Sequence, residues 1–143
     1  MLLDECALHK ILELHEQFSR DISAERPDGA RLIAGNKELH FAIYGQAGMP
    51  MLMEMIESLW LRIGPILNYD LRTNSSRVAE RVQADHHDSI VAALKIRDAK
   101  AAEKALRADI DSAADYIVSV GALVSADNLP EAEVEDFLGT MAR

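Results

Sequence analysis

Polar residues stand at positions of three predicted helices where the apolar pattern expects inward-facing side chains. Asn36 and His40 are four residues apart, so both lie on one face of their helix. His87 falls in line with the apolar residues of a second helix, and Asp109 does so in a third. An ionised carboxylate is costly to bury unless it is paired or bound to a cation. Helical bundles build metal sites from imidazoles and carboxylates that meet inside them, so the pattern points to a metal centre.

A structural interpretation of the same residues remains open. His40 alone would fit a hydrogen-bonded histidine of the core, and Asp109 could pair with Arg62 or with the N-terminus of a helix. His86 and His87 are neighbours and point about 100° apart, so only one of them can face the centre well. His87 has the more apolar companions. Periodicity therefore supports both a metal site and a buried hydrogen-bond network.

Other catalytic motifs are weak or missing. The sequence has no glycine-rich phosphate loop, no H-x-x-x-H helix signature and no E-x-x-H pair. Ser89 lies near His86, but no third group is evident to orient a nucleophile and its base. Cys6 has no positive neighbour other than His9 and is expected to be inert. His15 lies on an apolar stripe without a polar companion, which favours a structural role.

The chain reads almost entirely as helix, which predicts an all-α fold, an antiparallel bundle of about six helices. Asn74, Ser75 and Ser76 supply N-caps for the fourth helix, Asp98 caps the fifth, and Gly121 suits the C-cap of the fifth. The expected helices cover about residues 3–26, 30–47, 51–71, 77–96 and 99–120, with a short one that starts at Pro130.

The third predicted helix has a long apolar stripe that should face the core. Pro65 lies inside this helix and is predicted to kink it, because proline removes a hydrogen-bond donor and clashes with the preceding turn. The residues of the third helix that are expected to face inward are Leu52, Met55, Ile56, Leu59, Trp60, Ile63 and Leu67.

Length, composition and charge exclude several classes of protein. The 143 residues suit one domain, and 49% hydrophobic with 27% charged residues excludes a wholly disordered chain. The single cysteine excludes a disulfide framework and a multi-cysteine zinc finger. A net charge of −9 predicts no direct contact with nucleic acid. No apolar run approaches the ~20 residues of a membrane span, and nothing resembles an export signal, so a cytoplasmic location is expected.

Five short segments, in order along the chain, resemble motifs of the FCD domain, the C-terminal effector-binding domain of GntR-type transcriptional regulators. Residues 36–43 (NKELHFAI) and 45–52 (GQAGMPML) resemble the family's D-x-x-F-H segment and its AAGNPLL turn. Residues 86–94 (HHDSIVAAL) resemble E-H-x-x-I-x-x-A-I, residues 97–102 (RDAKAA) resemble G-D-x-x-x-A, and residues 106–110 (LRADI) resemble M-x-x-H-L. The resemblance covers about residues 5–120.

This resemblance implies a metal site of one aspartate and three histidines, completed by a small carboxylate effector. By position the ligands are Asn36, His40, His87 and Asp109. Two depart from the family pattern, since Asn36 stands in place of aspartate and Asp109 in place of histidine. Two histidines and one aspartate still suffice for a divalent cation with open positions. Zinc is expected, with nickel or manganese as alternatives, and Asn36 could bind through water.

The sequence thus predicts a metal-associated, ligand-binding and dimerising domain of a GntR-type regulator, and not an enzyme. The exposed apolar edges of the first and third helices are the candidates for the dimer interface that the resemblance implies. The effector is expected to be a small organic or sugar acid whose carboxylate binds the metal with help from Arg62 or Arg72. One alternative is a metal-dependent hydrolase or lyase, for which no second acid or base is evident. The other is a purely structural interaction domain.

The expected organisation is one effector-binding bundle followed by a tail. The bundle should occupy residues 1–124, and residues 125–143 should form a linker and a short helix. The family places a basic winged-helix DNA-binding domain before the bundle, and this sequence is expected to lack it.

Overall fold

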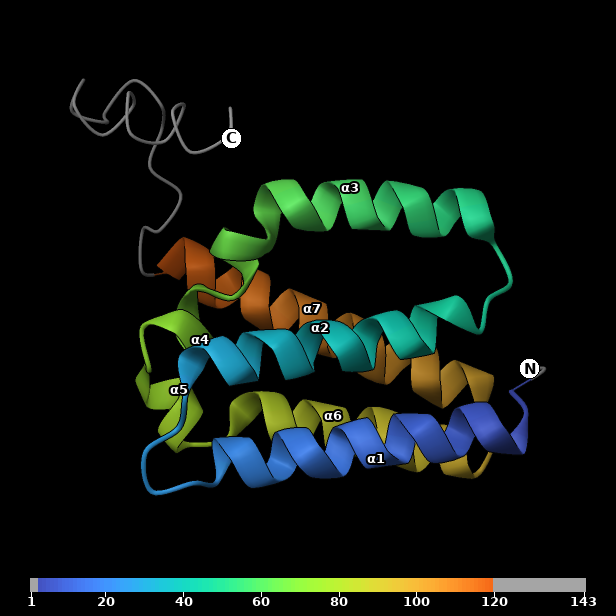
Figure 1. Ribbon diagram of the computed structural model, residues 1–143, viewed down its shortest axis with the longest axis horizontal. Coiled ribbons are helices and arrows are strands. Elements are labelled where there is room, and N and C mark those ends of the chain that lie inside the picture. The colour runs from blue at the N-terminus through green and yellow to red at the C-terminus, as the bar shows by residue number, and fades with distance from the viewer. Residues whose placement is uncertain (1–2, 120–143) are drawn as a thin grey trace.

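The computed structural model describes residues 3–119, which form seven helices and no strand (Figure 1). The long helices lie in an antiparallel bundle, which confirms the predicted all-α class. None of these helices is both long and apolar enough to cross a membrane. Gly121 and the helix expected after Pro130 lie outside the described residues. The helices are α1 (Glu5–Ile22), α2 (Gly29–Gly45), α3 (Pro50–Leu67), α4 (Tyr69–Arg72), α5 (Ser76–Ala79), α6 (Val82–Lys95) and α7 (Ala99–Ser119).

Aspartates fix the start of three of the long helices. The carboxylates of Asp4 and Asp28 accept hydrogen bonds from the first-turn backbone N–H groups of α1 and α2. Asp98 does the same for α7, where its Oδ1 lies 2.9 Å from the backbone nitrogen of Ala101. An N-cap side chain satisfies a donor that the helix itself leaves unpaired. The N-cap predicted at Asp98 is therefore confirmed.

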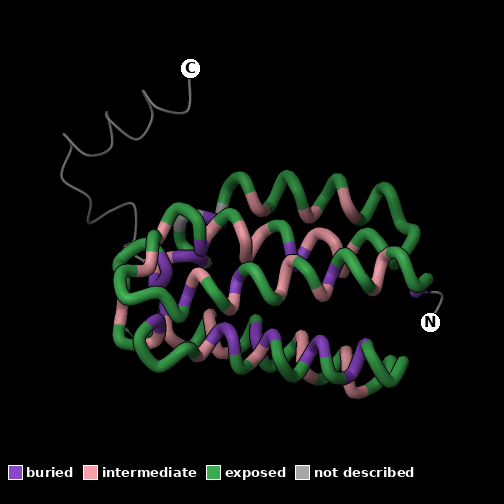
Figure 2. Tube along the Cα trace, turned by 60° about the horizontal axis from the view of Figure 1, so that its bottom comes forward, coloured by how far each residue is buried: buried purple, intermediate pink, exposed green. Residues whose placement is uncertain are grey.

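Two clusters of buried apolar side chains hold α1, α2, α6 and α7 together. Along α6, His87 lies between Ala84 of one cluster and Ile90 of the other, so a polar position separates them. Figure 2 shows buried residues recurring along the facing sides of these helices. The clusters contain Leu3, Ile11, Leu39, Ile90, Val91 and Leu94, and Phe18, Ile22, Leu32, Leu71, Val78 and Ala84.

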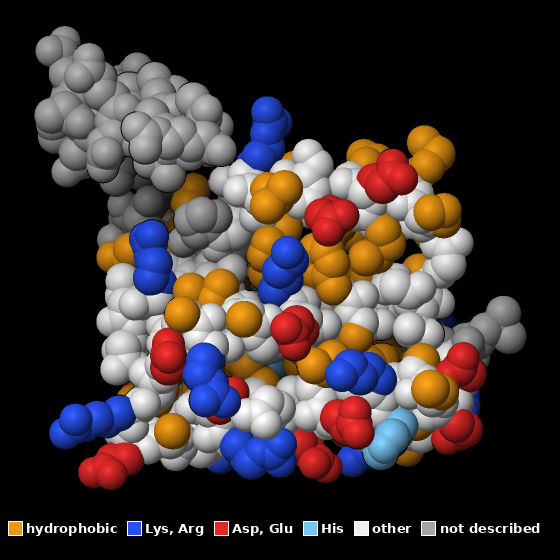
Figure 3. Space-filling view, viewed as in Figure 1, with side chains coloured by type: hydrophobic (Ala, Val, Ile, Leu, Met, Phe, Trp, Pro, Cys, Tyr) orange, Lys and Arg blue, Asp and Glu red, His pale blue; other side chains and the backbone are white. Residues whose placement is uncertain are grey.

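Helix α3 packs loosely on one side of the bundle, and the prediction that its apolar stripe faces inward is wrong for several residues. Leu52, Met55 and Leu59 are 40%, 62% and 52% exposed, whereas Ile56 and Trp60 are half-buried. Figure 3 shows hydrophobic side chains gathered along this helix. Periodicity reveals which residues share a face, but it does not reveal what that face meets. The side chains of Ile63 and Leu67, also expected to face inward, lie outside the described part of the structure.

Two predicted helices are each divided into two. The third was expected to reach Leu71, but α3 continues past Pro65 and ends at Leu67, and α4 begins at Tyr69. The side chain of Asn68 donates to the carbonyl of Gly64 at 2.8 Å, a local bond that competes with helix continuation.

The predicted fourth helix is interrupted at Arg81. This residue adopts a left-handed conformation with φ of 58°, and α6 begins only after it. Of the three N-caps predicted for this segment, Ser75 takes the N-cap position of α5, but its side chain makes no capping hydrogen bond. The prediction of one continuous helix from Arg77 is therefore wrong.

Replacing Gly29 with alanine is expected to destabilise the fold, because α2 begins in close contact with α4. A Cβ atom at Gly29 would lie 2.8 Å from the carbonyl oxygen of Leu71. Gly29→Ala should lower the free energy of unfolding by about 1–3 kcal/mol, as measured by chemical denaturation. Gly45→Ala is the control, because its Cβ would meet nothing within 4 Å. Equal stability of the two variants would contradict this packing.

Candidate metal centre and effector cavity

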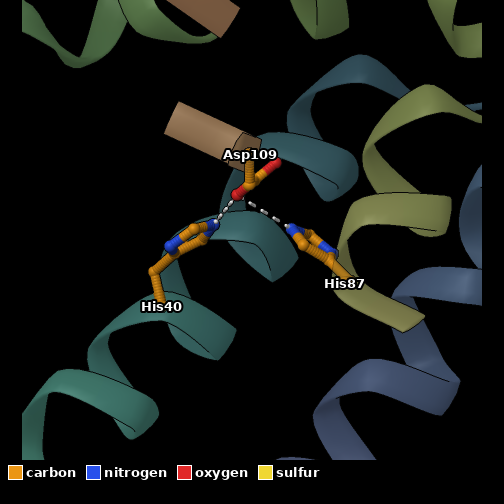
Figure 4. A group of neighbouring side chains, drawn as sticks. All are labelled: His40, His87 and Asp109. Carbon is orange, nitrogen blue, oxygen red and sulfur yellow. Dashed lines mark ion pairs between the residues drawn. The ribbon is translucent and has the colours of Figure 1, made fainter. Parts of the chain in front are cut away.

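Helices α2, α6 and α7 bring His40, His87 and Asp109 together inside the bundle (Figure 4). The Nε2 atom of His40 lies 3.1 Å from Oδ2 of Asp109, and Nε2 of His87 lies 3.9 Å from the same oxygen. All three residues are buried, and one donor atom from each lies within 4.8 Å of the other two. Three of the four predicted ligands therefore converge at one point.

Small side chains allow the helices that carry these groups to approach one another. Ala102 and Ala105 of α7 pack against the apolar cluster that includes Ile90 and Val91 of α6. On α6, these apolar residues share a face with His87 through spacings of three and four positions. The packing of α7 against α6 thus places Asp109 close to His87.

The rings of the two histidines are held differently. His40 is fixed at both nitrogens, since Nδ1 lies 3.0 Å from the hydroxyl of Tyr44 and Nε2 faces Asp109. His87 is fully buried, its ring centroid lies 4.7 Å from that of Phe18, and neither of its nitrogens has a hydrogen-bond partner among the described residues. The 3.9 Å that separates His87 from Asp109 is too long for a hydrogen bond. A buried polar atom without a partner calls for an explanation, and a cation bound by the three residues would supply one for Nε2 of His87.

Burial and the neighbouring charges set the protonation of this group. Burial, together with His40, lowers the pKa of His87 to about 3, so its imidazole is neutral at physiological pH. Burial alone would raise the pKa of Asp109, but the hydrogen bond and charge of His40 outweigh burial and lower it. Burial raises the pKa of Tyr44 to about 12, and Asp109 adds to the effect. The group therefore presents a neutral imidazole, an anionic carboxylate and a neutral phenol.

A cavity of about 350 Å³ opens beside this group, and His40 and Asp109 form part of its wall. Its size lies within the range of small-molecule sites. Most of the other wall side chains are apolar, and none of the described lysines or arginines contributes. The remaining lining residues are Asn36, Tyr44, Ile56, Leu59, Trp60, Asp70, Leu71, Gln83, Ile110 and Ala113.

Comparison with known proteins places this helical site in a family. A sequence profile described as the FCD domain matches residues 3–112. The chain belongs to the FCD domain family. The chain is also similar to the HTH-type transcriptional regulator McbR of Escherichia coli K12, with 36% identity over 92 residues. The aligned region covers 64% of this chain and 40% of that regulator. No solved structure matches the chain.

The remaining predicted site residues of this FCD domain lie outside the triad. Asn36 is one helical turn from His40, lines the cavity, and donates from its amide nitrogen to the side chain of Asn68 at 3.0 Å. Arg62 and Arg72 are exposed and do not line the cavity. The structure thus brings Asn36 near the triad and leaves both arginines away from the cavity wall.

Two buried polar residues of the cavity were not identified as site residues from the sequence. Asp70 accepts a hydrogen bond from the backbone of Leu71 at 2.9 Å, one from Arg77 at 3.2 Å, and one from the side chain of Gln83. Burial raises the pKa of Asp70, although these partners oppose the change. Gln83 stands four residues before His87 on the same face of α6, and that spacing was the available signal. Asp70 gave no such signal, because it fell within a helix predicted to be continuous.

The buried His87 is expected to make this FCD domain lose stability in mild acid when metal is chelated. The unfolded chain protonates His87 near its usual pKa of 6.5, whereas the folded pKa is lowered to about 3. Below pH 6.5 the unfolded state therefore binds more protons than the folded state. The free energy of unfolding consequently decreases as pH falls. Between pH 7 and pH 5 the loss should be roughly 2 kcal/mol. Melting temperatures in chelator should fall less steeply for His87→Gln, and identical slopes would contradict the neutral buried state.

Proposed function

We propose that this FCD domain senses a small organic or sugar acid through a bound divalent metal and belongs to a GntR-type transcriptional regulator. The observation that carries the proposal is the convergence of His40, His87 and Asp109 beside a cavity, where neither ring nitrogen of His87 has a hydrogen-bond partner among the described residues. The kinship with the transcriptional regulator McbR supports a regulatory role over an enzymatic one.

The donor set of the triad fits a divalent transition metal. Two imidazole nitrogens and one carboxylate oxygen are ligands that zinc accepts, and nickel or manganese are alternatives. The metal, when bound, supplies positive charge and open positions for the carboxylate of an effector. His40 is oriented by Tyr44, and Asp109 contributes the negative charge. Asn36 would contribute its amide oxygen, directly or through a water molecule.

Charge makes the metal necessary for binding an acid. The acidic side chains of the cavity wall are Asp70 and Asp109, and none of the described lysines or arginines lines the cavity. Without a metal, a carboxylate that entered would meet Asp109 in a poorly solvated space, where like charges repel strongly. Because Arg62 and Arg72 lie away from the wall, the metal is the cation on which the proposal depends.

The alternative to a metal site is a buried hydrogen-bond network that has only a structural role, and one observation favours it. The contact of 3.1 Å between His40 and Asp109 is a sound buried hydrogen bond that needs no metal. That network, however, leaves His87 fully buried without a partner for either nitrogen. A metal would also give Nε2 of His87 a partner, whereas the network leaves both nitrogens of His87 without one among the described residues.

Thermal melting with a panel of organic and sugar acids tests the proposed function. Zinc alone should raise the melting temperature, and an acid that binds should raise it further only when zinc is present. A ligand at a hundred times its Kd stabilises the folded state by about 2.7 kcal/mol. Acids that stabilise the protein equally in chelator, or a full panel without effect on the zinc-loaded protein, would overturn the proposal. Assays for turnover of the same panel test the hydrolase or lyase alternative.

We also propose that the domain forms a homodimer through α3. Met51, Met55 and Leu61 are 77%, 62% and 70% exposed on this helix, whereas the large exposed hydrophobic residues of the described chain include none from α1. Such apolar exposure is typical of interaction surfaces. Sedimentation equilibrium should give a dimer mass, and Met55→Glu should shift the protein towards monomer. Ile96→Glu, at the equally exposed end of α6, is the control and should remain dimeric. A wild-type monomer at all concentrations would contradict the proposal.

In the whole regulator, this domain would act on DNA only through another part of the protein. Its sequence carries a net charge of −9, which opposes direct contact with nucleic acid. A two-fold dimer would present two DNA-binding domains to two half-sites. We propose a cytoplasmic location, because the relative McbR is a transcriptional regulator.

A further inference from the structure

The cavity has a second polar layer one helical turn away from the triad. Asn36 precedes His40 by four residues on α2, and Gln83 precedes His87 by four residues on α6. Figure 1 shows that α2 and α6 run in the same direction, so both residues are displaced towards the same end of the bundle. Four residues of helix correspond to about 6 Å. Asp70 of α4, which is bonded to Gln83, joins this layer.

This layer contains a buried hydrogen-bond acceptor that has no partner among the described residues. The amide nitrogen of Gln83 is bonded to Asp70, and its Oε1 is buried with no partner among the described residues. The amide nitrogen of Asn36 likewise donates one hydrogen bond, to the side chain of Asn68. Asp70 is itself an acceptor, held by Arg77. Gln83 Oε1 is therefore a buried acceptor without a donor among the described residues, which is costly.

The charge of the site favours a ligand with a single carboxylate. A divalent cation with Asp109 and two neutral imidazoles carries one net positive charge, which one carboxylate neutralises. Asp70 is already paired with Arg77 at 3.2 Å. A second carboxylate of the ligand would meet Gln83 Oε1 and Asp70, so it would add an acceptor and a like charge where a donor is needed.

We propose that Gln83 and Asp70 select an effector with one carboxylate and, at its other end, a hydroxyl or ammonium group. The carboxylate occupies the metal side of the cavity, and the donor group satisfies Gln83 Oε1. Dicarboxylates of the same length are rejected. This inference rests on the proposed function, because it assigns the chemical class of the acid that the same cavity binds.

Matched probes test the proposal by calorimetry on the zinc-loaded protein. The probes are 4-hydroxybutanoate and 4-aminobutanoate, with pentanoate as the methyl analogue and glutarate as the dicarboxylate, and the same comparison is repeated over longer and shorter chains. The best donor-bearing acid should bind about tenfold more tightly than its methyl analogue, the ratio expected for one buried hydrogen bond. Glutarate and its homologues should bind more weakly than the methyl analogue.

Variants then assign the preference to Gln83. Gln83→Met removes the acceptor while keeping a side chain of similar length, so the donor-bearing acid should lose its tenfold advantage and the methyl analogue should be unaffected. Gln46→Met, at the exposed end of α2, is the control and should keep the advantage. In the wild type, the side-chain amide resonances of Gln83 should shift with the donor-bearing acid and not with pentanoate, a measurement that does not depend on any variant.

The outcomes separate this inference from the proposed function. If the methyl analogue or the dicarboxylate binds as tightly as the donor-bearing acid, the preference assigned to Gln83 is refuted while metal-dependent sensing of acids stands. If Gln83→Met folds and keeps the tenfold advantage, Gln83 is not the selecting residue. If no acid binds the zinc-loaded protein, both the inference and the proposed function fail.

Discussion

Replacing both His40 and His87 with alanine is expected to abolish stoichiometric zinc binding. The two imidazoles and Asp109 supply the donors that converge in the described structure, so the double variant would retain a single carboxylate. Loss of a residue that merely orients a ligand costs about 10–100-fold in metal affinity, and loss of two ligands should cost more than that. Metal content measured after dialysis against limiting zinc checks the result.

His9→Ala is the control for that experiment, because His9 is exposed on α1 and pairs with Glu13. It should bind zinc as the wild type does. Undiminished metal content in the double variant would remove the triad from consideration as a metal centre.

Alanine and histidine at Asp109 should have opposite effects on metal binding. Asp109→Ala removes the anionic donor and leaves two neutral imidazoles, so zinc affinity and the stabilisation by zinc should both fall. Asp109→His restores a nitrogen donor of the type that the FCD family has at this position, so metal should be retained. Thermal melting of both variants, with and without chelator, measures the difference.

A structural network predicts a different result for the same pair of variants. If Asp109 only bonds to His40, alanine would leave a buried histidine without its partner and destabilise the fold by about 3–5 kcal/mol. Asp109→His would be no more stable than Asp109→Ala, and chelator would leave the melting temperatures of both variants unchanged. Equal melting temperatures that do not respond to chelator would thus reject the metal role.

The sequence predicted the triad because helical periodicity assigns residues to faces, and buried faces must converge in a bundle. His40, His87 and Asp109 each interrupt the apolar face of a helix, and this interruption is visible in the sequence of that helix alone. The breaks at Asn68 and Arg81 were not predicted, since they depend on a side-chain bond to a backbone carbonyl and on a left-handed residue. Neither feature alters the apolar pattern.

Asp70 and the orientation of α3 were beyond sequence reasoning for a different reason. The role of Asp70 depends on Arg77 and Gln83, which the turns between α4 and α6 bring to it. The apolar residues of α3 spread around much of the helix, so their pattern could not specify which ones meet the bundle. The placement of Arg62 outside the cavity wall follows from that same orientation.

Helix α3 links two events that would otherwise be independent. Ile56, Leu59 and Trp60 of this helix form part of the cavity wall, and its exposed side carries the apolar residues proposed to meet a second copy. A ligand that holds α3 in one position therefore changes the free energy of association, and association changes ligand affinity by the same factor. Because α3 contributes to both the cavity wall and the proposed dimer surface, a signal from effector to dimer would pass through the position of this helix.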